Sequence, residues 1–300
     1  MRATQTSGGR PDPQERPGLA ICQENTREAP LQHIHDAPRI GIAGFGYVGK
    51  QLHEALTGAD GRTLGLEPAF VWARRAELLA GIDASHRLHD LSDFAMHRPS
   101  LIVEAAHPDI TRRHGADFLA SSDYMPLSVS ALADAEVHEA LVEAARCNGT
   151  RLLLPAGALV GAASLVASRS MWRDVTITFR KNPGNIDFSE SGITLGPLER
   201  AQTVFEGPVR EIAGLFPRNV NTMVTCALAT VGLDRCIGRL IADPDMDCAI
   251  AEVEAVGRDG SIVRTEKRQP VVGVSGTEMF ASLLHSIKTR FGRFEAIDVL

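Results

Sequence analysis

A glycine-rich turn of the pattern G-x-G-x-x-G, at residues 44–49, limits what this chain can fold into more than any other feature of its sequence. The turn directly follows the short apolar segment 39–43 (RIGIA), which predicts a buried strand. It also begins the segment 47–56, which predicts a helix. Alone, the pattern is also compatible with a purely structural turn. Between a strand and a helix, it predicts a dinucleotide-binding βαβ unit.

Each glycine of the turn has a physical task in such a unit. Gly44 permits the tight turn, Gly46 lets the backbone approach a pyrophosphate, and Gly49 lets the helix pack closely on the strand. The helix N-terminus then offers free N–H groups and a partial positive charge to the phosphates. We therefore expect cofactor contacts from the whole turn, which also contains Phe45, Tyr47 and Val48.

Predicted strands and helices alternate through the first half of the chain. Further strands are expected at 68–73, 100–104, 124–129 and 151–154, and helices at 111–120 and 131–147. Strands that alternate with helices at this spacing are typical of parallel βαβ units. The fold class expected for residues 39–157 is therefore α/β, with a Rossmann-type doubly wound parallel sheet.

The pattern changes after residue 160, where strands are grouped rather than separated by helices. Strands are expected at 174–179, 236–242, 249–256 and 262–268, and helices at 220–228 and 276–290. The turn at 258–261 (RDGS) predicts a hairpin between the last two strands. Residues 158–300 are thus expected to form an α+β substrate and oligomerisation domain, whose last helix packs back on the first domain.

The first 38 residues differ from the rest in composition. They are rich in proline, glycine, glutamine and charge, and contain too little apolar surface to order themselves. We expect a flexible extension; the alternative is an arm that clasps a partner subunit. The stretch also lacks the apolar run of about 7–15 residues that a signal peptide needs, so a cytoplasmic location is expected.

Composition argues against several functional classes. The 300 residues carry 31 basic and 37 acidic side chains, a formal net charge of −6, and no basic run, which argues against binding nucleic acid. No apolar run reaches the roughly 18 residues of a membrane span. The five cysteines are scattered without a C-x-x-C pair, and the histidines show no metal-like pairing with acids. We therefore expect neither a disulfide framework nor a metal site.

The end of the second predicted strand usually selects between the two nicotinamide cofactors. An acid at this position binds the ribose 2′-OH of NAD, but here the strand is followed by Arg74 and Arg75. An arginine there pairs with a 2′-phosphate and stacks on adenine. The sequence therefore favours NADP(H) over NAD(H), the alternative being that both arginines are a solvated helix start.

A series of short motifs follows in a fixed order along the chain. They are 104–108 (EAAHP), 128–134 (SVSALAD), 155–158 (PAGA), 180–183 (RKNP), 205–207 (FEG), 216–221 (FPRNVN) and 242–244 (ADP). Through them the chain resembles the L-aspartate dehydrogenase family over roughly residues 39–286. The resemblance implies NAD(P)-linked interconversion of L-aspartate with iminosuccinate, which water and ammonia link to oxaloacetate. It also implies a homodimer or homotetramer.

Cationic and amide side chains that suit a dicarboxylate gather at Arg180, Lys181 and Asn182. Successive residues of a strand point to opposite faces, so only one of the two cations is expected to contact substrate. We favour Lys181 as the substrate-binding and catalytic cation, with Asn182 beside it. The alternative is a surface charge pair next to a Pro-Gly turn.

Further candidates lie near predicted element ends. Asn219 and Asn221 stand at a helix start, where one side chain can cap the helix while the other binds cofactor or substrate. The resemblance implies a cofactor-binding asparagine at Asn221 and a cofactor-binding alanine within Gly157–Ala158. His107 follows a strand at the ligand-binding edge of the sheet, either as a proton-transfer group or as a loop residue that shapes the pocket. The remaining expected cofactor contacts are Ala106, His107 and Ser128.

The resemblance fails at the position of the family's presumed catalytic histidine. The pattern Asn-x-His-Glu-Ile is replaced here by residues 249–253 (AIAEV), so Ala251 stands in place of the histidine and Ala249 in place of the asparagine. Three interpretations stay open. The protein is an amino-acid dehydrogenase in which His107, Lys181 or water handles protons; it reduces a different imine or keto acid; or it binds nucleotide without catalysis.

Overall fold

The computed structural model describes residues 37–272, 275–276 and 279–292, which form two β-sheets with their covering helices. The extension expected at residues 1–38 lies almost wholly outside the described part of the chain. The first sheet is parallel and the second is mixed, so the predicted fold class is confirmed. No helix of the described residues is long and apolar enough to span a membrane.

The first sheet has the strand order β3-β2-β1-β4-β5, and all its strands are parallel. Its strands are β1 (Arg39–Ala43), β2 (Glu67–Trp72), β3 (Arg87–Leu88), β4 (Leu101–Glu104) and β5 (Asp123–Pro126). Its helices are α1 (Tyr47–Thr57), α2 (Ala59–Leu64), α3 (Pro108–Phe118) and α4 (Ala135–Asn148), with 3-10 turns η1 (Ala76–Leu79), η2 (Ala84–His86), η3 (Leu91–His97) and η4 (Val129–Ala133). The strand order reverses between β1 and β4, which is where doubly wound sheets bind ligands.

Two expectations for this half need correction. Residues 151–154, expected to form a strand, do not form one; a single β-bridge joins Leu152 to Tyr124 of β5. Pro126 and Pro155, which have no N–H, prevent a longer ladder at this edge. The long helix expected from residue 131 begins only at α4, because the Asp134 side chain accepts hydrogen bonds from the N–H groups of Glu136 and Val137 and so caps it there.

The second sheet has the order β10-β9-β6-β8-β7, in which only β6 and β8 run parallel. Its strands are β6 (Trp172–Lys181), β7 (Gln202–Pro208), β8 (Ile237–Ala242), β9 (Ala249–Gly257) and β10 (Ile262–Gln269). The other elements are α5 (Ala162–Ala167), α6 (Val209–Leu215), α7 (Asn221–Ala229), η5 (Arg169–Met171), η6 (Pro183–Asn185) and the two-residue strands β11 (Val271–Val272) and β12 (Ser275–Gly276). Sequence reasoning missed β7 and α6, but the hairpin predicted at 258–261 joins β9 to β10.

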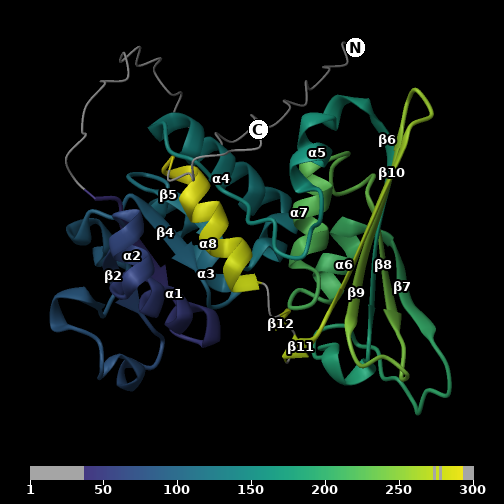
Figure 1. Cartoon of the computed structure of the whole chain (residues 1–300), viewed down its shortest axis with the longest axis horizontal. Helices are drawn as coiled ribbons and strands as arrows, with labels where there is room; N and C mark the ends of the chain where they lie inside the picture. The colour runs from purple at the N-terminus through teal and green to yellow at the C-terminus, as the bar shows by residue number, and fades with distance from the viewer. Residues whose placement is uncertain (1–36, 273–274, 277–278, 293–300) are drawn as a thin grey trace, which may run out of the picture. The chain divides into compact units, whose positions relative to one another are not determined.

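Helices α5, α6 and α7 lie on the face of the second sheet that is turned toward the first (Figure 1). Val209 and Ile212 of α6 and Met223 of α7 are fully buried, and all three approach Gly238 of β8. This packing directs one face of the sheet, and the residues at its strand ends, toward the glycine turn.

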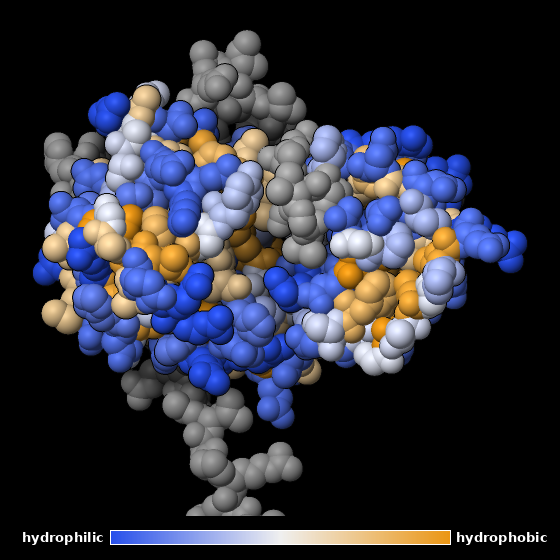
Figure 2. All heavy atoms as spheres, turned by 90° about the horizontal axis from the view of Figure 1, so that it is seen from below, coloured by the Kyte–Doolittle hydropathy of each residue, from blue (hydrophilic) through white to orange (hydrophobic). Residues whose placement is uncertain are grey.

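The last helix, α8 (Met279–Arg290), returns to the first sheet and packs beside α1 (Figure 1). Leu283 and Ile287 are buried in the core under α1, and the Arg290 guanidinium pairs with the buried carboxylate of Asp123 at the start of β5. The chain therefore crosses between the two sheets twice, and a hollow lies between them. Figure 2 shows this hollow, with polar and charged residues around its mouth.

Candidate active site

A cavity of about 360 Å³ opens where the two sheets face each other. From the first half it is lined by the loops that follow β1, β4 and β5; from the second half it is lined by β6, β9, β10 and the start of α7. Clefts of this size between domains are typical of sites for small molecules and cofactors. The cavity is therefore the candidate active site.

The glycine turn lies at this cavity and has the geometry that a pyrophosphate needs. Gly44 has a φ of +124°, and a Cβ there would lie 2.5 Å from the carbonyl oxygen of Ala105. A Cβ on Gly49 would lie 2.0 Å from the carbonyl oxygen of Gly44, whereas a Cβ on Gly46 would meet nothing within 4 Å. No side chain caps α1, so its first N–H groups are left for a ligand. The turn thus fits a dinucleotide, with open space beside Gly46.

The two arginines that follow β2 are exposed, and neither lines the cavity. The strand ends at Trp72, whose carbonyl oxygen accepts a hydrogen bond from Gly44 N–H at 2.9 Å. Arg74 and Arg75 therefore stand close to the glycine turn in the fold. No acid occupies the end of β2, as the sequence indicated.

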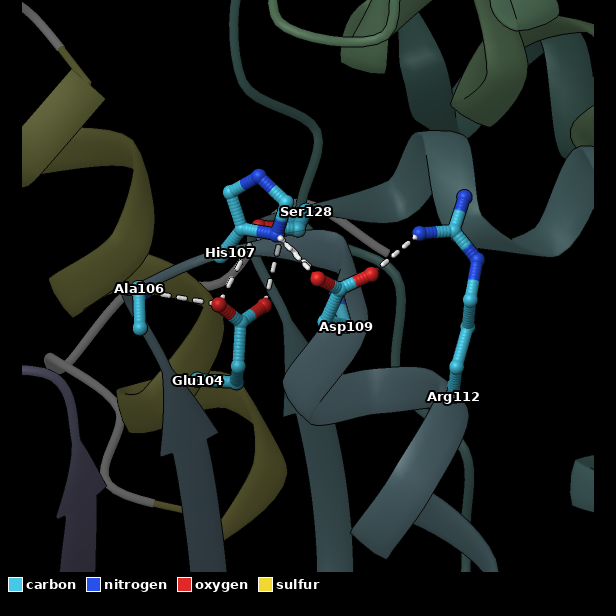
Figure 3. A network of polar contacts seen from close by, with 6 residues as sticks. All are labelled: Glu104, Ala106, His107, Asp109, Arg112 and Ser128. Carbon is cyan, nitrogen blue, oxygen red and sulfur yellow. Dashed lines mark hydrogen bonds and ion pairs between the residues drawn. The ribbon is translucent and has the colours of Figure 1, made fainter. Parts of the chain in front are cut away.

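A buried carboxylate that sequence reasoning gave no role organises the loops around the cavity (Figure 3). Glu104, the last residue of β4, is fully buried, and one of its oxygens accepts hydrogen bonds from Ala106 N–H at 2.6 Å and Ser128 Oγ at 3.1 Å. Its other oxygen accepts a hydrogen bond from Ser128 N–H at 3.0 Å. Burial raises the pKa of this carboxyl group, and the hydrogen bonds it accepts act in the opposite direction. An acid inside an otherwise apolar strand, LIVE, is the signal that could have found it.

His107 caps a helix and is also partly exposed at the cavity. Its Nδ1 accepts a hydrogen bond from Asp109 N–H at 3.2 Å and thereby caps α3. The imidazole side chain is 48% exposed and lines the cavity. The same Nδ1 atom lies 3.4 Å from the carboxylate of Asp109.

Lys181 is almost completely enclosed at the end of β6. Its exposed fraction is 6%, it lines the cavity, and its ammonium group lies 5.2 Å from the ring centroid of Phe179. Burial lowers the pKa of this lysine to about 8. The neighbouring Arg180 points to the other face and pairs with Asp243 at 2.8 Å. The strand therefore separates the two cations as alternation predicts.

The asparagines are used differently from what the sequence indicated. Neither Asn219 nor Asn221 caps α7. The Asn221 Oδ1 accepts a hydrogen bond from Ser130 N–H at 2.9 Å, which ties α7 to the loop after β5. Asn219 bonds through both ends of its amide to the backbone of Asp187. Both side chains still line the cavity, because tertiary contacts rather than helix capping hold them there.

Asn182 lies outside the cavity lining. Its Oδ1 accepts a hydrogen bond from Gly184 N–H, and its Nδ2 donates to the carbonyl oxygens of Pro244 and Met246. Asn182 therefore shapes the turn behind Lys181. The expected contact residues that do line the cavity are Tyr47, Val48, Ala106, His107, Ser128, Gly157, Ala158, Lys181, Asn219 and Asn221.

The second sheet adds lining residues that sequence reasoning missed. Ala251 of β9 stands directly opposite Phe179 of β6 on one side and Lys267 of β10 on the other. Gln269 likewise stands opposite Ala249, and Arg218 lines the cavity from the loop before α7. No carboxylate is found among the described residues that line the cavity, whereas Lys181, Arg218 and Lys267 are cationic. Arg218 also pairs with the carboxylate of Asp187, behind the lining, at 2.8 Å. The site therefore favours an anionic ligand.

Comparison with known proteins gives a consistent family. Residues 163–285 match a family model described as aspartate dehydrogenase, C-terminal, and residues 44–155 match one described as homoserine dehydrogenase, NAD binding domain. An aspartate dehydrogenase domain-containing protein of Xenopus tropicalis is 37% identical, over 83% of this chain and 93% of its own length. An L-aspartate dehydrogenase of Methanosarcina acetivorans is 31% identical, over 82% and 93%. The crystal structure of aspartate dehydrogenase from Thermotoga maritima superimposes with a TM-score of 0.64 at 25% identity, covering 89% of this chain and 100% of that one.

Proposed function

Because this chain belongs to the aspartate dehydrogenase family of NAD-binding oxidoreductases, we propose that it interconverts L-aspartate and iminosuccinate with a nicotinamide cofactor. The observation that carries the proposal is the cavity beside the glycine turn: three cationic side chains line it, one of them (Arg218) paired with Asp187, and no carboxylate is found among the described lining residues. An acidic amino acid carries two carboxylates and requires such a lining.

The residues around the glycine turn suit a dinucleotide. Gly46 and the N-terminus of α1 would hold the pyrophosphate, and Arg74 and Arg75 would favour the 2′-phosphate of NADP(H) over the plain ribose of NAD(H). The nicotinamide supplies the hydride acceptor or donor when it is bound. Ala106, His107 and Ser128 line the cavity on the side of the first sheet and would contact the bound cofactor.

Lys181 is the proposed proton acceptor. As a neutral amine it takes one proton from the substrate ammonium group, which frees the nitrogen lone pair as hydride leaves Cα and yields the iminium form of the product. Water then adds to the iminium carbon and ammonium leaves, giving oxaloacetate. In the reverse direction the protonated lysine returns its proton to the amine. A lysine whose pKa burial lowers to about 8 is suited to both directions near neutral pH.

A second candidate function is favoured by the floor of the cavity. Ala249 and Ala251 present only methyl groups there, which leaves room for a substrate whose second group differs from that of aspartate. The reaction would then be the NADP(H)-dependent reduction of another imine or keto acid.

The test is oxidation of NADPH and of NADH, in parallel, by the purified protein with oxaloacetate and ammonia. Turnover is expected, with a preference for NADPH that Arg74→Ala reduces. Turnover only with other keto acids and an amine would support the second candidate. Cofactor binding without any turnover would contradict both and leave a non-catalytic nucleotide-binding protein.

A further inference from the structure

Three neighbouring strands of the second sheet, β6, β9 and β10, form the floor of the cavity. Phe179 of β6, Ala251 of β9 and Lys267 of β10 stand in one row across the strands. Residues directly opposite each other on paired strands point to the same face of the sheet. The side chains of this row therefore all face the cavity, and each of the three lines it.

The second row lies two residues along, where Gln269 of β10 stands opposite Ala249 of β9. Gln269 also lines the cavity, and its Oε1 atom is buried without a hydrogen-bond partner among the described residues. A buried polar group that lacks a partner costs free energy unless a ligand satisfies it. Because the terminal amide can turn about its last bond, it can present either its N–H₂ or its oxygen to that ligand.

Ala249 and Ala251 are small residues of the middle strand, β9, and they leave a gap between the lysines of the two flanking strands. Lys181 is enclosed on β6, and Lys267 stands on β10 beyond β9. Paired strands lie about 4.8 Å apart, so the backbones of β6 and β10 are separated by roughly 10 Å. Long lysine side chains bridge part of that distance, which leaves a span suited to a small molecule with an anionic group at each end.

We propose that Lys267, assisted by the amide of Gln269, binds the side-chain carboxylate of the substrate across the methyl groups of Ala251 and Ala249. Lys267 is thereby the residue that selects a dicarboxylic amino acid over one with an uncharged side chain. The proposal rests on the proposed function, because it assigns the second carboxylate of that same substrate. With the side-chain carboxylate of the substrate at Lys267, its amino group and Cα lie on the side of Lys181.

The variant that tests this is Lys267→Met, which keeps the length and apolar stem of the side chain but removes its charge. Arg268→Ala is the matched control, because Arg268 is the next residue of β10, is exposed on the opposite face and pairs with Glu266. L-Aspartate is compared with L-2-aminobutyrate, in which a methyl group replaces the side-chain carboxylate. Binding of succinate to the protein saturated with NADP⁺ is measured by calorimetry beside the kinetics.

We expect Lys267→Met to raise the KM for L-aspartate at least tenfold, with kcat changed less than threefold, and to leave L-2-aminobutyrate unaffected. Succinate binding should weaken by a similar factor, Lys267→Arg should restore most of it, and Arg268→Ala should change neither. Unchanged succinate affinity in Lys267→Met overturns the inference even if L-aspartate is turned over. If the wild-type protein turns over no substrate, the proposed function fails, but the inference is still decided by whether succinate binds and whether Lys267→Met weakens it.

Discussion

The carboxylate of Glu104 holds Ser128 by two hydrogen bonds, one from its N–H at 3.0 Å and one from its hydroxyl at 3.1 Å. The pair joins the loop after β4 to the loop after β5, and both loops line the cavity. Glu104 itself is fully buried and does not line the cavity. It therefore holds these two loops together from behind the cavity lining.

Replacing Glu104 with glutamine should loosen this side of the site. The amide has the same shape, but its N–H₂ group faces donors, so at least one of the accepted hydrogen bonds is lost. We expect the Kd for the nicotinamide cofactor to rise at least fivefold, measured by quenching of protein fluorescence. Ser128→Ala removes one of these hydrogen bonds but keeps the backbone N–H bond, and it should have a smaller effect. Unchanged cofactor affinity in Glu104→Gln would remove the positioning role.

Two valine substitutions in the glycine turn should have opposite consequences. Gly46→Val should abolish cofactor binding and preserve the fold, because Gly46 has an ordinary φ of −82° and open space around its missing Cβ. Gly49→Val should instead destabilise the protein, since its Cβ would lie 2.0 Å from the carbonyl oxygen of Gly44. Thermal unfolding and cofactor titration of both variants distinguish these cases. Normal cofactor affinity in a folded Gly46→Val protein would refute the assignment of the turn.

The proton-transfer role of Lys181 predicts the pH dependence of the two directions. Oxidation of L-aspartate needs the neutral amine, whose fraction rises as pH passes through the pKa of about 8. We expect kcat/KM for oxidation to rise about tenfold between pH 7 and pH 9, and kcat/KM for reductive amination to fall over the same interval. Stopped-flow or steady-state rates in constant ionic strength buffers measure both. Profiles that keep the same midpoint in Lys181→Met would assign the titration to another group.

Removing the amine of Lys181 should cost activity but stabilise the fold. Burial lowers the pKa of Lys181 from 10.5 to about 8, so the charged form destabilises the folded state at and below neutral pH. Between pH 8 and pH 10.5 the unfolded chain binds the proton and the folded chain does not, so this cost declines as pH rises. Lys181→Met should therefore increase the free energy of unfolding at pH 7 by about 2–3 kcal/mol, and the gain should shrink toward pH 10. Urea unfolding measures this, with Lys50→Met as the exposed control.

Elements with strong local signals were predictable. The apolar run before Gly44 and the glycine spacing after it are sufficient for β1 and α1, because both depend on neighbours along the chain. The RDGS turn likewise predicts the hairpin of β9 and β10. The strand expected at 151–154 does not form because Pro126 and Pro155 interrupt the ladder. The helix cap expected from one of Asn219 and Asn221 does not form either, because distant backbone groups bind both amides. The local sequence does not show which distant backbone groups compete for a side chain.

The sequence by itself determined the parallel sheet, the dinucleotide turn, the absence of an acid after β2 and the opposite directions of Arg180 and Lys181. These follow from glycine conformation, apolar periodicity and strand alternation, which act over a few residues. Only the tertiary structure decided that Glu104 and Lys181 are buried and that Lys267 stands across Ala251 from Phe179. Burial and strand register arise from contacts between segments far apart in the sequence, such as Ser130 with Asn221, 91 residues apart, and Asp123 with Arg290, 167 residues apart. Desolvation of charged side chains, which sets their pKa values, comes into being only with those contacts.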